Sequence, residues 1–150
     1  MRVAIGADHG GLPLKDDIIE VLEADGHEVL DLGAYEFDPA DDYPDLTAPV
    51  ARAVSSGEAD RGIVLCGSGV GAAIAANKIK GARASVTHDT YTAAQGVQHD
   101  NMNIICLGSR VIGPETARAV TRAFMGAVMD PHPRFARRLE KVISLEIESH

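Results

Sequence analysis

The chain has 150 residues, 45% of them hydrophobic and 24% charged, and this length and composition predict one globular domain spanning residues 1–150. Its net charge of -8 and its aromatic content of 4%, with no tryptophan, argue against nucleic acid as a partner, because a polyanion is repelled and residues that could stack on bases are scarce. No apolar run reaches the roughly 18 residues of a membrane span, no signal peptide is evident, and two cysteines are too few for a disulfide framework, so we expect a cytoplasmic protein.

Five short apolar segments of the sequence alternate with segments of helical character. The first segment, 2–7, is followed by the clearest helical pattern, 12–24, whose apolar residues lie on one face. The remaining elements are, in chain order, predicted strand 28–32, helix 45–55, strand 62–66, helix 70–79, strand 82–86, helix 90–98, strand 103–107, and helices 114–128 and 134–148.

The composition of these strands indicates how they are arranged. The first, third and fifth are nearly continuous runs of aliphatic residues, which is typical of a parallel sheet whose two faces are both covered by helices. The alternation of strand and helix favours right-handed crossovers between the strands. We therefore predict a three-layer α/β/α sandwich, in which a doubly wound, Rossmann-like, five-stranded parallel sheet is joined by an extra C-terminal helix.

Polar and reactive residues follow the predicted strands directly. In a doubly wound sheet the ligand binds beyond the carboxyl ends of the strands, so these residues are candidates for a site. They are Asp8-His9-Gly10-Gly11 after the first strand, Cys66 to Gly71 after the third, His88-Asp89 after the fourth and Gly108-Ser109-Arg110 after the fifth. We expect His99 and Asp100, at the end of the helix before the fifth strand, on the same rim of the sheet.

Cys66 ends an apolar strand and enters a turn with three glycines that opens a helix. The unpaired backbone N–H groups of such a turn carry partial positive charge, so they favour an anion and favour thiolate over thiol. A cysteine in this position can serve as a base or a nucleophile near neutral pH. Cys106 lies inside the fifth predicted strand, where we interpret it as a core residue.

Three kinds of site could use the turn that follows Cys66. A cysteine phosphatase requires an arginine after five intervening residues, and Ala72 stands there, which excludes that class. A dinucleotide site requires G-x-G-x-x-G/A, which Gly67, Gly69 and Ala72 satisfy formally, with Asp89 about 20 residues further on. The third kind transfers a proton on a small phosphorylated sugar, with the thiolate removing a proton beside a carbonyl and the N–H groups stabilising the enediolate oxygen.

Residues elsewhere in the chain support proton transfer. Asp8 and His9 would add a carboxylate and an imidazole, and His99 would add a second imidazole for acid–base work near pH 7. The last predicted helix carries basic residues at i, i+4 and i+7, namely Arg134, Arg138 and Lys141. In an acidic protein this stripe suits a phosphate dianion, and the same spacing fits a solvated helix face equally well.

Several stretches of the sequence together resemble one family. They are A-I-G-A-D-H-G-G-L-P-L-K at 4–15, D-Y-P-D at 42–45, C-G-S-G-V-G-A-A-I-A-A-N-K-I-K-G-A-R-A at 66–84 and N-I-I-C-L-G-S-R-V-I-G at 103–113, followed by the arginine-bearing last helix. On these residues the chain resembles, over essentially its whole length, the type B ribose-5-phosphate isomerases, a family that also includes subunits of galactose-6-phosphate isomerase.

The resemblance implies an aldose–ketose isomerase that uses no metal or other cofactor and acts through an enediolate, in a homodimer or tetramer whose sites are shared between subunits. It implies that Cys66 moves a proton between C1 and C2 and that His99 opens the sugar ring. It implies an anion hole made by Gly67, Ser68, Gly69, Val70 and Gly71. The remaining implied contacts are Asp8 to the sugar hydroxyls and ring oxygen, Tyr43 at the wall of the site, and His9, Arg110, Arg134 and Arg138 to the phosphate.

Asp100 departs from the family pattern, in which an asparagine often follows the ring-opening histidine. A carboxylate accepts hydrogen bonds but cannot donate them as an amide does, so the substrate contact expected at this position changes. Our interpretation is an isomerase of D-ribose 5-phosphate and D-ribulose 5-phosphate. The alternatives are the same chemistry on a four-carbon erythrulose phosphate or a six-carbon allose or galactose 6-phosphate and, from a different class, a nucleotide-binding module.

Overall fold

A computed structural model of the chain describes residues 1–149, so the last residue of the expected 1–150 domain lies outside it. Within that range strands and helices alternate as the sequence predicts. The elements are β1 (Arg2–Ala7), α1 (Leu12–Ala24), β2 (Glu28–Asp31), α2 (Tyr43–Ser55), β3 (Arg61–Cys66), α3 (Val70–Ala76), β4 (Ala84–Val86), α4 (Thr90–Asp100), β5 (Ile104–Gly108), α5 (Pro114–Gly126) and α6 (Pro133–Ser149).

The five strands form one parallel sheet in the order β2-β1-β3-β5-β4. The three strands that the sequence marks as nearly continuous aliphatic runs are the three inner ones, β1, β3 and β5, which helices cover on both faces. The two outer strands are shorter, and β4 spans only three residues. The prediction of a doubly wound, five-stranded parallel sheet is confirmed.

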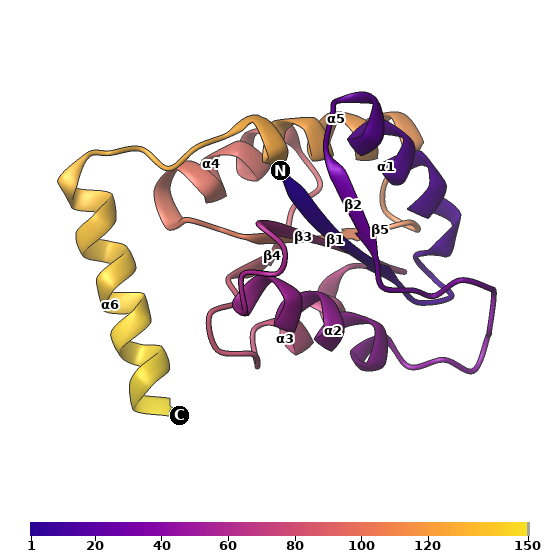
Figure 1. The fold of residues 1–150 in the computed structure, drawn as a ribbon, viewed down its shortest axis with the longest axis horizontal. Helices are drawn as coiled ribbons and strands as arrows, with labels where there is room; N and C mark the ends of the chain where they lie inside the picture. Colours follow the sequence, from indigo (N-terminus) through magenta and orange to yellow (C-terminus); the bar gives the residue numbers. More distant parts are fainter. Residues whose placement is uncertain (150) are drawn as a thin grey trace.

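Helices cover the two faces of the sheet and complete the three-layer sandwich (Figure 1). Helices α1, α4 and α5 pack on one face, where Ile18, Val97 and Phe124 are fully or almost fully buried. Helices α2 and α3 pack on the opposite face, where Val50 and Ala72 are fully buried. Each face therefore has its own apolar cluster, and the sheet separates the two.

Two helix boundaries differ from the prediction in ways that affect the loops nearby. Helix α2 begins at Tyr43 rather than at residue 45, because Pro44 is compatible with the first helical turn, where its missing N–H costs nothing. Helix α3 ends at Ala76 rather than at residue 79. The side chain of Asn77 pairs there with both the N–H and the carbonyl of Ala84, at 2.8 Å each, and so joins the helix end to β4.

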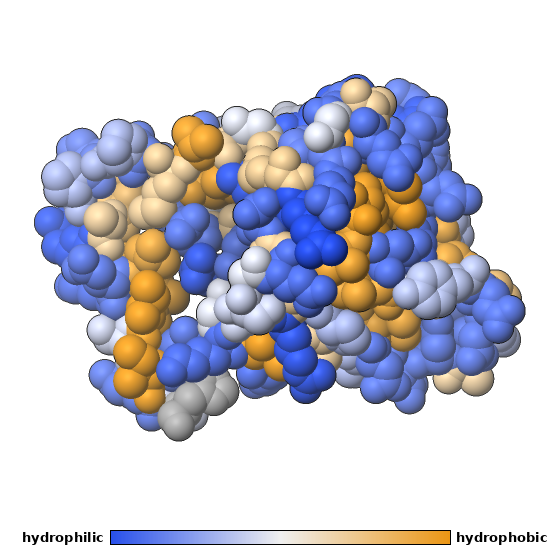
Figure 2. Space-filling model, viewed as in Figure 1, coloured by the Kyte–Doolittle hydropathy of each residue, from blue (hydrophilic) through white to orange (hydrophobic). Residues whose placement is uncertain are grey.

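Helix α6 stands apart from the three layers, and none of its residues is buried (Figure 1). It begins beside α4, and its far part meets the turn before β4, where Glu146 Oε1 accepts a hydrogen bond from the Gly81 N–H at 2.7 Å. Apolar residues gather along it (Figure 2), with Val142, Leu145 and Ile147 all more than half exposed. Among the helices of residues 1–149, none is long and apolar enough to span a membrane.

Candidate active site

The loops that follow β1, β3 and β5 enclose a cavity of about 380 Å³ at the carboxyl edge of the sheet. The chain runs from β1 toward the β2 edge and from β3 toward the β4 edge, so the crevice lies at the point where the winding direction changes. The structure thus brings together residues that the sequence places after three different strands. The cavity is lined by Asp8, His9, Gly10, Tyr43, Cys66, Gly67, Ser68, Gly71, Arg110 and Val111.

The bottom of this cavity, which we call the pocket floor, is the packed backbone of the turns at 8–11, 66–71 and 108–110. The Ser109 N–H donates to the Cys66 carbonyl at 2.9 Å and the Arg110 N–H to the Gly67 carbonyl at 3.1 Å. The Ser109 hydroxyl donates to the carbonyl of Gly10. A Cβ at Gly10 would lie 2.9 Å from the Gly67 nitrogen, so only glycine permits this approach. The resulting floor is preorganised, because these contacts hold the three turns in place before any ligand arrives.

Cys66 is 5% exposed, and its Sγ accepts a hydrogen bond from the Gly69 N–H at 2.8 Å. A backbone N–H in this position stabilises negative charge on a sulfur atom. Gly69 has φ 83°, a left-handed conformation that favours glycine, and a Cβ there would lie 3.0 Å from the carbonyl oxygen of Cys106. Next to it the Ser68 hydroxyl accepts from the Val70 N–H at 3.2 Å. The side chains of Ser68 and Val70 are both exposed at the mouth of the turn.

Cys106 lies in the core, as the sequence predicts. It is fully buried within β5, and burial raises the pKa of its thiol. A neutral buried thiol is a small apolar residue with no access to a substrate. Of the two cysteines, only Cys66 faces the cavity.

Tyr43 forms one wall of the cavity from the first position of α2. Its ring lies against Gly71 so closely that a Cβ added to that glycine would be 2.7 Å from the Tyr43 Cζ. The absence of a side chain at Gly71 therefore sets how far the ring reaches over the turn after Cys66. The sequence points to Tyr43 through the D-Y-P-D motif, but it does not indicate this contact.

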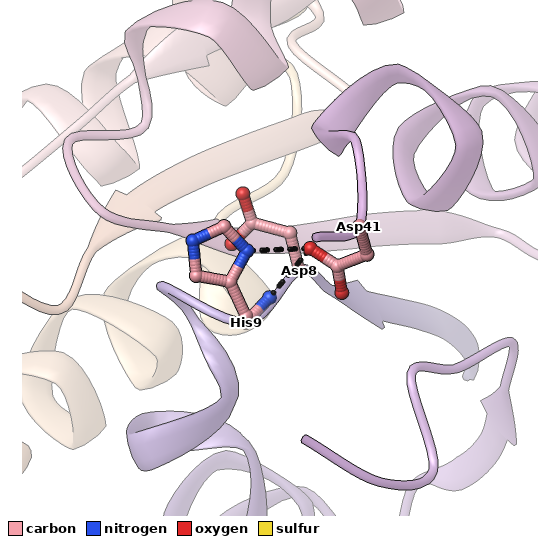
Figure 3. A group of neighbouring side chains, drawn as sticks. All are labelled: Asp8, His9 and Asp41. Carbon is pink, nitrogen blue, oxygen red and sulfur yellow. Dashed lines mark hydrogen bonds and ion pairs between the residues drawn. The ribbon is translucent and has the colours of Figure 1, made fainter. Parts of the chain in front are cut away.

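Asp8 and His9 leave β1 and enter the cavity side by side. Asp8 is almost fully buried, and its Oδ1 accepts from the Gly11 N–H at 2.9 Å. His9 Nδ1 lies 2.6 Å from Asp41 Oδ1 (Figure 3). This hydrogen bond has the largest effect and, with the charges of Asp41 and Asp8, raises the pKa of His9 against the opposing effects of burial and of Arg110. Asp41 is a functional candidate that the sequence analysis missed, because nothing in its neighbourhood marks it as a partner of residue 9.

The same three side chains, Asp8, His9 and Asp41, offer one ligand atom each within 4.8 Å of one another, a spacing that a metal ion could use. Within this group, His9 Nδ1 and Asp41 Oδ1 are hydrogen-bonded to each other. Asp8 Oδ1 is occupied by a backbone N–H. The cluster is therefore a hydrogen-bond network in its own right.

His99 and Asp100 do not lie on the rim that carries the cavity, so the expectation for their position is wrong. Helix α4 starts at the carboxyl edge after β4 and runs back across the sheet, so its last residues reach the amino edge, where β5 begins. Asp100 lines a separate cavity of about 390 Å³ with Arg83 and Gln95. The fault in the expectation is geometric, since a crossover helix runs antiparallel to the strands it connects.

Arg134 and Arg138 are exposed on α6, which stands outside the three layers. Within residues 1–149 neither forms an ion pair closer than 4.0 Å, although the chain is acidic, and neither lines the cavity of its own chain. Arg110, in contrast, lines the cavity directly from the loop after β5, beside Gly67. One of the predicted phosphate-binding arginines is thus in place within a single chain, and two are not.

The residues after β4 have contacts within the fold. Asp89 precedes α4 and accepts a hydrogen bond from the Thr92 N–H at 2.7 Å, and this contact lowers the pKa of its carboxyl. His88 Nε2 accepts from the Gly108 N–H at 2.8 Å, and burial lowers the pKa of His88. Asp89 is therefore used as a helix cap, which leaves the dinucleotide interpretation without its acidic residue.

Comparison with known proteins identifies the family of the chain. The sequence model of the family described as Ribose/Galactose Isomerase matches residues 3–142. The chain is 37% identical over 148 residues to D-erythrulose-4-phosphate isomerase 2 of Mycolicibacterium smegmatis, covering 97% of each chain. It is 41% identical over 145 residues to ribose-5-phosphate isomerase B of Escherichia coli, covering 97% of this chain and 96% of that one.

Solved structures of relatives share the fold of this chain. The solved structure of ribose-5-phosphate isomerase B from Clostridium thermocellum matches with a TM-score of 0.95 and 41% identity, and each chain is covered completely. The chain therefore belongs to the ribose/galactose isomerase family and is an isomerase.

Proposed function

We propose that the chain interconverts D-ribose 5-phosphate and D-ribulose 5-phosphate. The observation that carries this proposal is Cys66, whose sulfur accepts a backbone N–H bond at the glycine turn and faces a cavity shared with Asp8, His9 and Arg110. A base, hydroxyl-binding groups and cations around a space of about 380 Å³ suit a small sugar phosphate. The relatives named for ribose 5-phosphate and erythrulose 4-phosphate support the substrate class.

Proton transfer begins on the open-chain aldose. The Cys66 thiolate takes the proton from C2, and the electron pair of the broken C–H bond forms the enediolate double bond while negative charge gathers on O1. The N–H groups of the turn from Gly67 to Gly71 stabilise that charge, and the Ser68 hydroxyl assists them. Return of the proton to C1, with a hydroxyl proton passing from O2 to O1, gives the ketose. The same Cys66 sulfur thus carries the proton from C2 to C1.

Other residues prepare the substrate and hold it. His99 opens the furanose ring by moving a proton to the ring oxygen, and Asp8 binds that oxygen and the neighbouring hydroxyls. Tyr43 and Val70 border the sugar at the mouth of the turn. Asp100, next to His99, accepts a hydrogen bond from the sugar where an asparagine could also donate one. The phosphate is bound by the cations His9, Arg110, Arg134 and Arg138, because charge-assisted hydrogen bonds hold a dianion well.

The complete site takes residues from two subunits of a homodimer. His99, Arg134 and Arg138 stand outside the cavity of their own chain, so a second subunit presents them. The exposed apolar side chains along α6 support this arrangement, since a helix face of this kind favours burial against another chain. The free thiols of Cys66 and Cys106 suit a reducing compartment such as the cytoplasm.

A panel of phosphorylated sugars, compared by kcat/KM, tests the proposal. We expect the highest value for ribose 5-phosphate and at most a small fraction of it for ribose, which lacks the phosphate. A Cys66→Ala sample prepared in the same way controls for isomerase carried over from the expression host. A higher kcat/KM for erythrulose 4-phosphate or a six-carbon phosphate would reassign the substrate. Saturable NAD binding without isomerase activity would point to the nucleotide-binding alternative.

A further inference from the structure

Asp41 is tied to His9 by two hydrogen bonds. Its Oδ1 accepts from the ring Nδ1 at 2.6 Å and from the His9 backbone N–H at 3.1 Å. Figure 3 shows both bonds, with the second ring nitrogen turned away from Asp41. The side chain of Asp41 is only 12% exposed, and its Oδ2 is buried without a hydrogen-bond partner among the described residues. The hydrogen bonds that this largely buried carboxylate accepts thus both come from His9.

The groups around the His9 ring come from three loops. The segment between β2 and α2 contributes Asp41 and also Phe37, whose ring meets the imidazole edge-on with centroids 6.2 Å apart. Asp8 faces the ring from its own loop, and Arg110 faces it from the loop after β5. The two carboxylates favour a charged imidazole, whereas desolvation of the ring and the nearby arginine oppose it. The hydrogen bond to Asp41 has the largest effect, and the pKa of His9 is raised.

The pairing decides which protons the ring can offer to a ligand. With Nδ1–H donating to Asp41, a neutral imidazole has only a lone pair at Nε2, and a phosphate oxygen cannot bind to a lone pair. The imidazolium carries a proton at both nitrogens, so it can donate to Asp41 and to a phosphate together. With Nδ1 paired to Asp41, His9 can therefore donate to a phosphate from Nε2 only as the imidazolium.

We infer that Asp41 is a positioning residue for the substrate phosphate, which holds His9 in the orientation and charge state that place a donor proton on Nε2. This inference rests on the proposed function. Asp41 does not line the cavity, so it acts on the phosphate through His9 alone. The result is a longer pH range over which the site binds a dianion, because the histidine stays charged at a pH where an unpaired one is neutral.

Asp41→Asn tests this, because the amide keeps an acceptor oxygen of the same shape but removes the charge. The matched control is Glu36→Gln, which removes one charge from an exposed residue of the same segment. The readouts are the His9 pKa by NMR, inhibition by inorganic phosphate, and KM and kcat between pH 5.5 and 8.5. The ionisation of the sugar phosphate is common to all variants and cancels in the comparison.

In Asp41→Asn we expect a lower His9 pKa and, near pH 7.5, about tenfold weaker phosphate inhibition and a correspondingly higher KM, with kcat little changed. The difference shrinks as the pH falls, because the imidazole becomes protonated in both proteins. In a His9→Gln background, Asp41→Asn has no further effect on phosphate binding.

An unchanged His9 pKa and phosphate inhibition in Asp41→Asn would overturn the inference, as would an equal effect from Glu36→Gln. Phosphate binding also separates this inference from the proposed function. If the unsubstituted protein isomerises no sugar phosphate but Asp41→Asn still weakens phosphate binding through His9, the role of Asp41 is supported and the proposed reaction is rejected.

Discussion

The imidazole of His99 stacks on the ring of Phe135, with the ring centroids 4.1 Å apart and an angle of 12° between the planes. Gln95 Nε2 lies 2.9 Å from Nδ1 of the same imidazole, so α4 and α6 fix its orientation together. Phe135 follows Arg134 directly in the chain. The histidine proposed to open the sugar ring and an arginine proposed to bind its phosphate therefore belong to one packed unit.

A complementation experiment tests whether sites are shared. Chains carrying Cys66→Ala and chains carrying His99→Asn are each expected to form nearly inactive dimers. When equal amounts are unfolded and refolded together, half of the dimers contain one chain of each kind, and each of these has one intact site. We expect about one quarter of the activity of the unsubstituted protein at the same chain concentration.

The control for this experiment is a mixture of Cys66→Ala and Cys66→Ser chains, which leaves no site with an intact base. Activity that does not return in the first mixture would show that His99 serves the cavity of its own chain. Native mass spectrometry of the refolded samples checks that mixed dimers have formed.

Cys66→Ala should lower kcat by about a thousandfold or more, because the variant has no base next to the glycine turn. Substrate binding, measured by calorimetry, should change little, since the cations and the pocket floor remain. Cys106→Ala is the matched control. It removes a buried thiol outside the cavity, so it should cost about 1 kcal/mol of unfolding free energy and leave kcat near its original value. Near-normal turnover in Cys66→Ala would reject Cys66 as the base.

Arg138→Ala should raise KM for a phosphorylated sugar by about tenfold or more, because a charge-assisted bond to the phosphate is lost. The neighbouring Arg137 points in another direction on the same exposed helix and has no role in the proposed site, so Arg137→Ala is the control for loss of one positive charge. Steady-state kinetics at two salt concentrations separates the specific contact from general attraction. If KM is equal in the two variants, the stripe on α6 is a solvated face.

Gly71→Ala should lower kcat/KM without lowering the melting temperature. The new Cβ displaces the Tyr43 ring, which is 40% exposed and free to swing outward, while alanine suits the helical position at least as well as glycine. Gly113→Ala is the control, since a Cβ at Gly113 meets nothing within 4 Å. In a Tyr43→Ala background the effect of Gly71→Ala on kcat/KM should disappear. Persistence of the full effect there would mean that the alanine acts on the turn itself.

The sheet and the region of the cavity were predictable from the sequence because both depend on patterns that repeat. Aliphatic strands bounded by glycine, aspartate or asparagine define the order of the elements, and the carboxyl-end rule then gathers Asp8, Cys66 and Arg110 at one edge. Position along the chain also told us that His99 ends a helix. It did not tell us that this end lies at the opposite edge, because that follows only when the direction of the crossover helix is considered.

Asp41 illustrates a second limit. It lies in a long connection between β2 and α2, and its partner His9 is 32 residues away. No periodicity links the two positions, since the bond depends on how the connection folds over the end of β1. Tyr43 and Gly71 are a similar case. Both stand in recognisable motifs, but their contact depends on α2 beginning two residues earlier than its helical pattern predicts.

The pocket floor is made of main-chain atoms, and this has a consequence for how such an enzyme can change. Substituting the wall residues Tyr43 or Val111 alters the width and depth of the cavity but leaves the main-chain N–H groups of the turns where they are. In the proposed reaction, the length of sugar that the cavity accepts can therefore change without changing the groups that act on C1 and C2. An ancestor with this architecture could pass from one sugar phosphate to another through changes at the rim, while its descendants kept the same way of moving a proton.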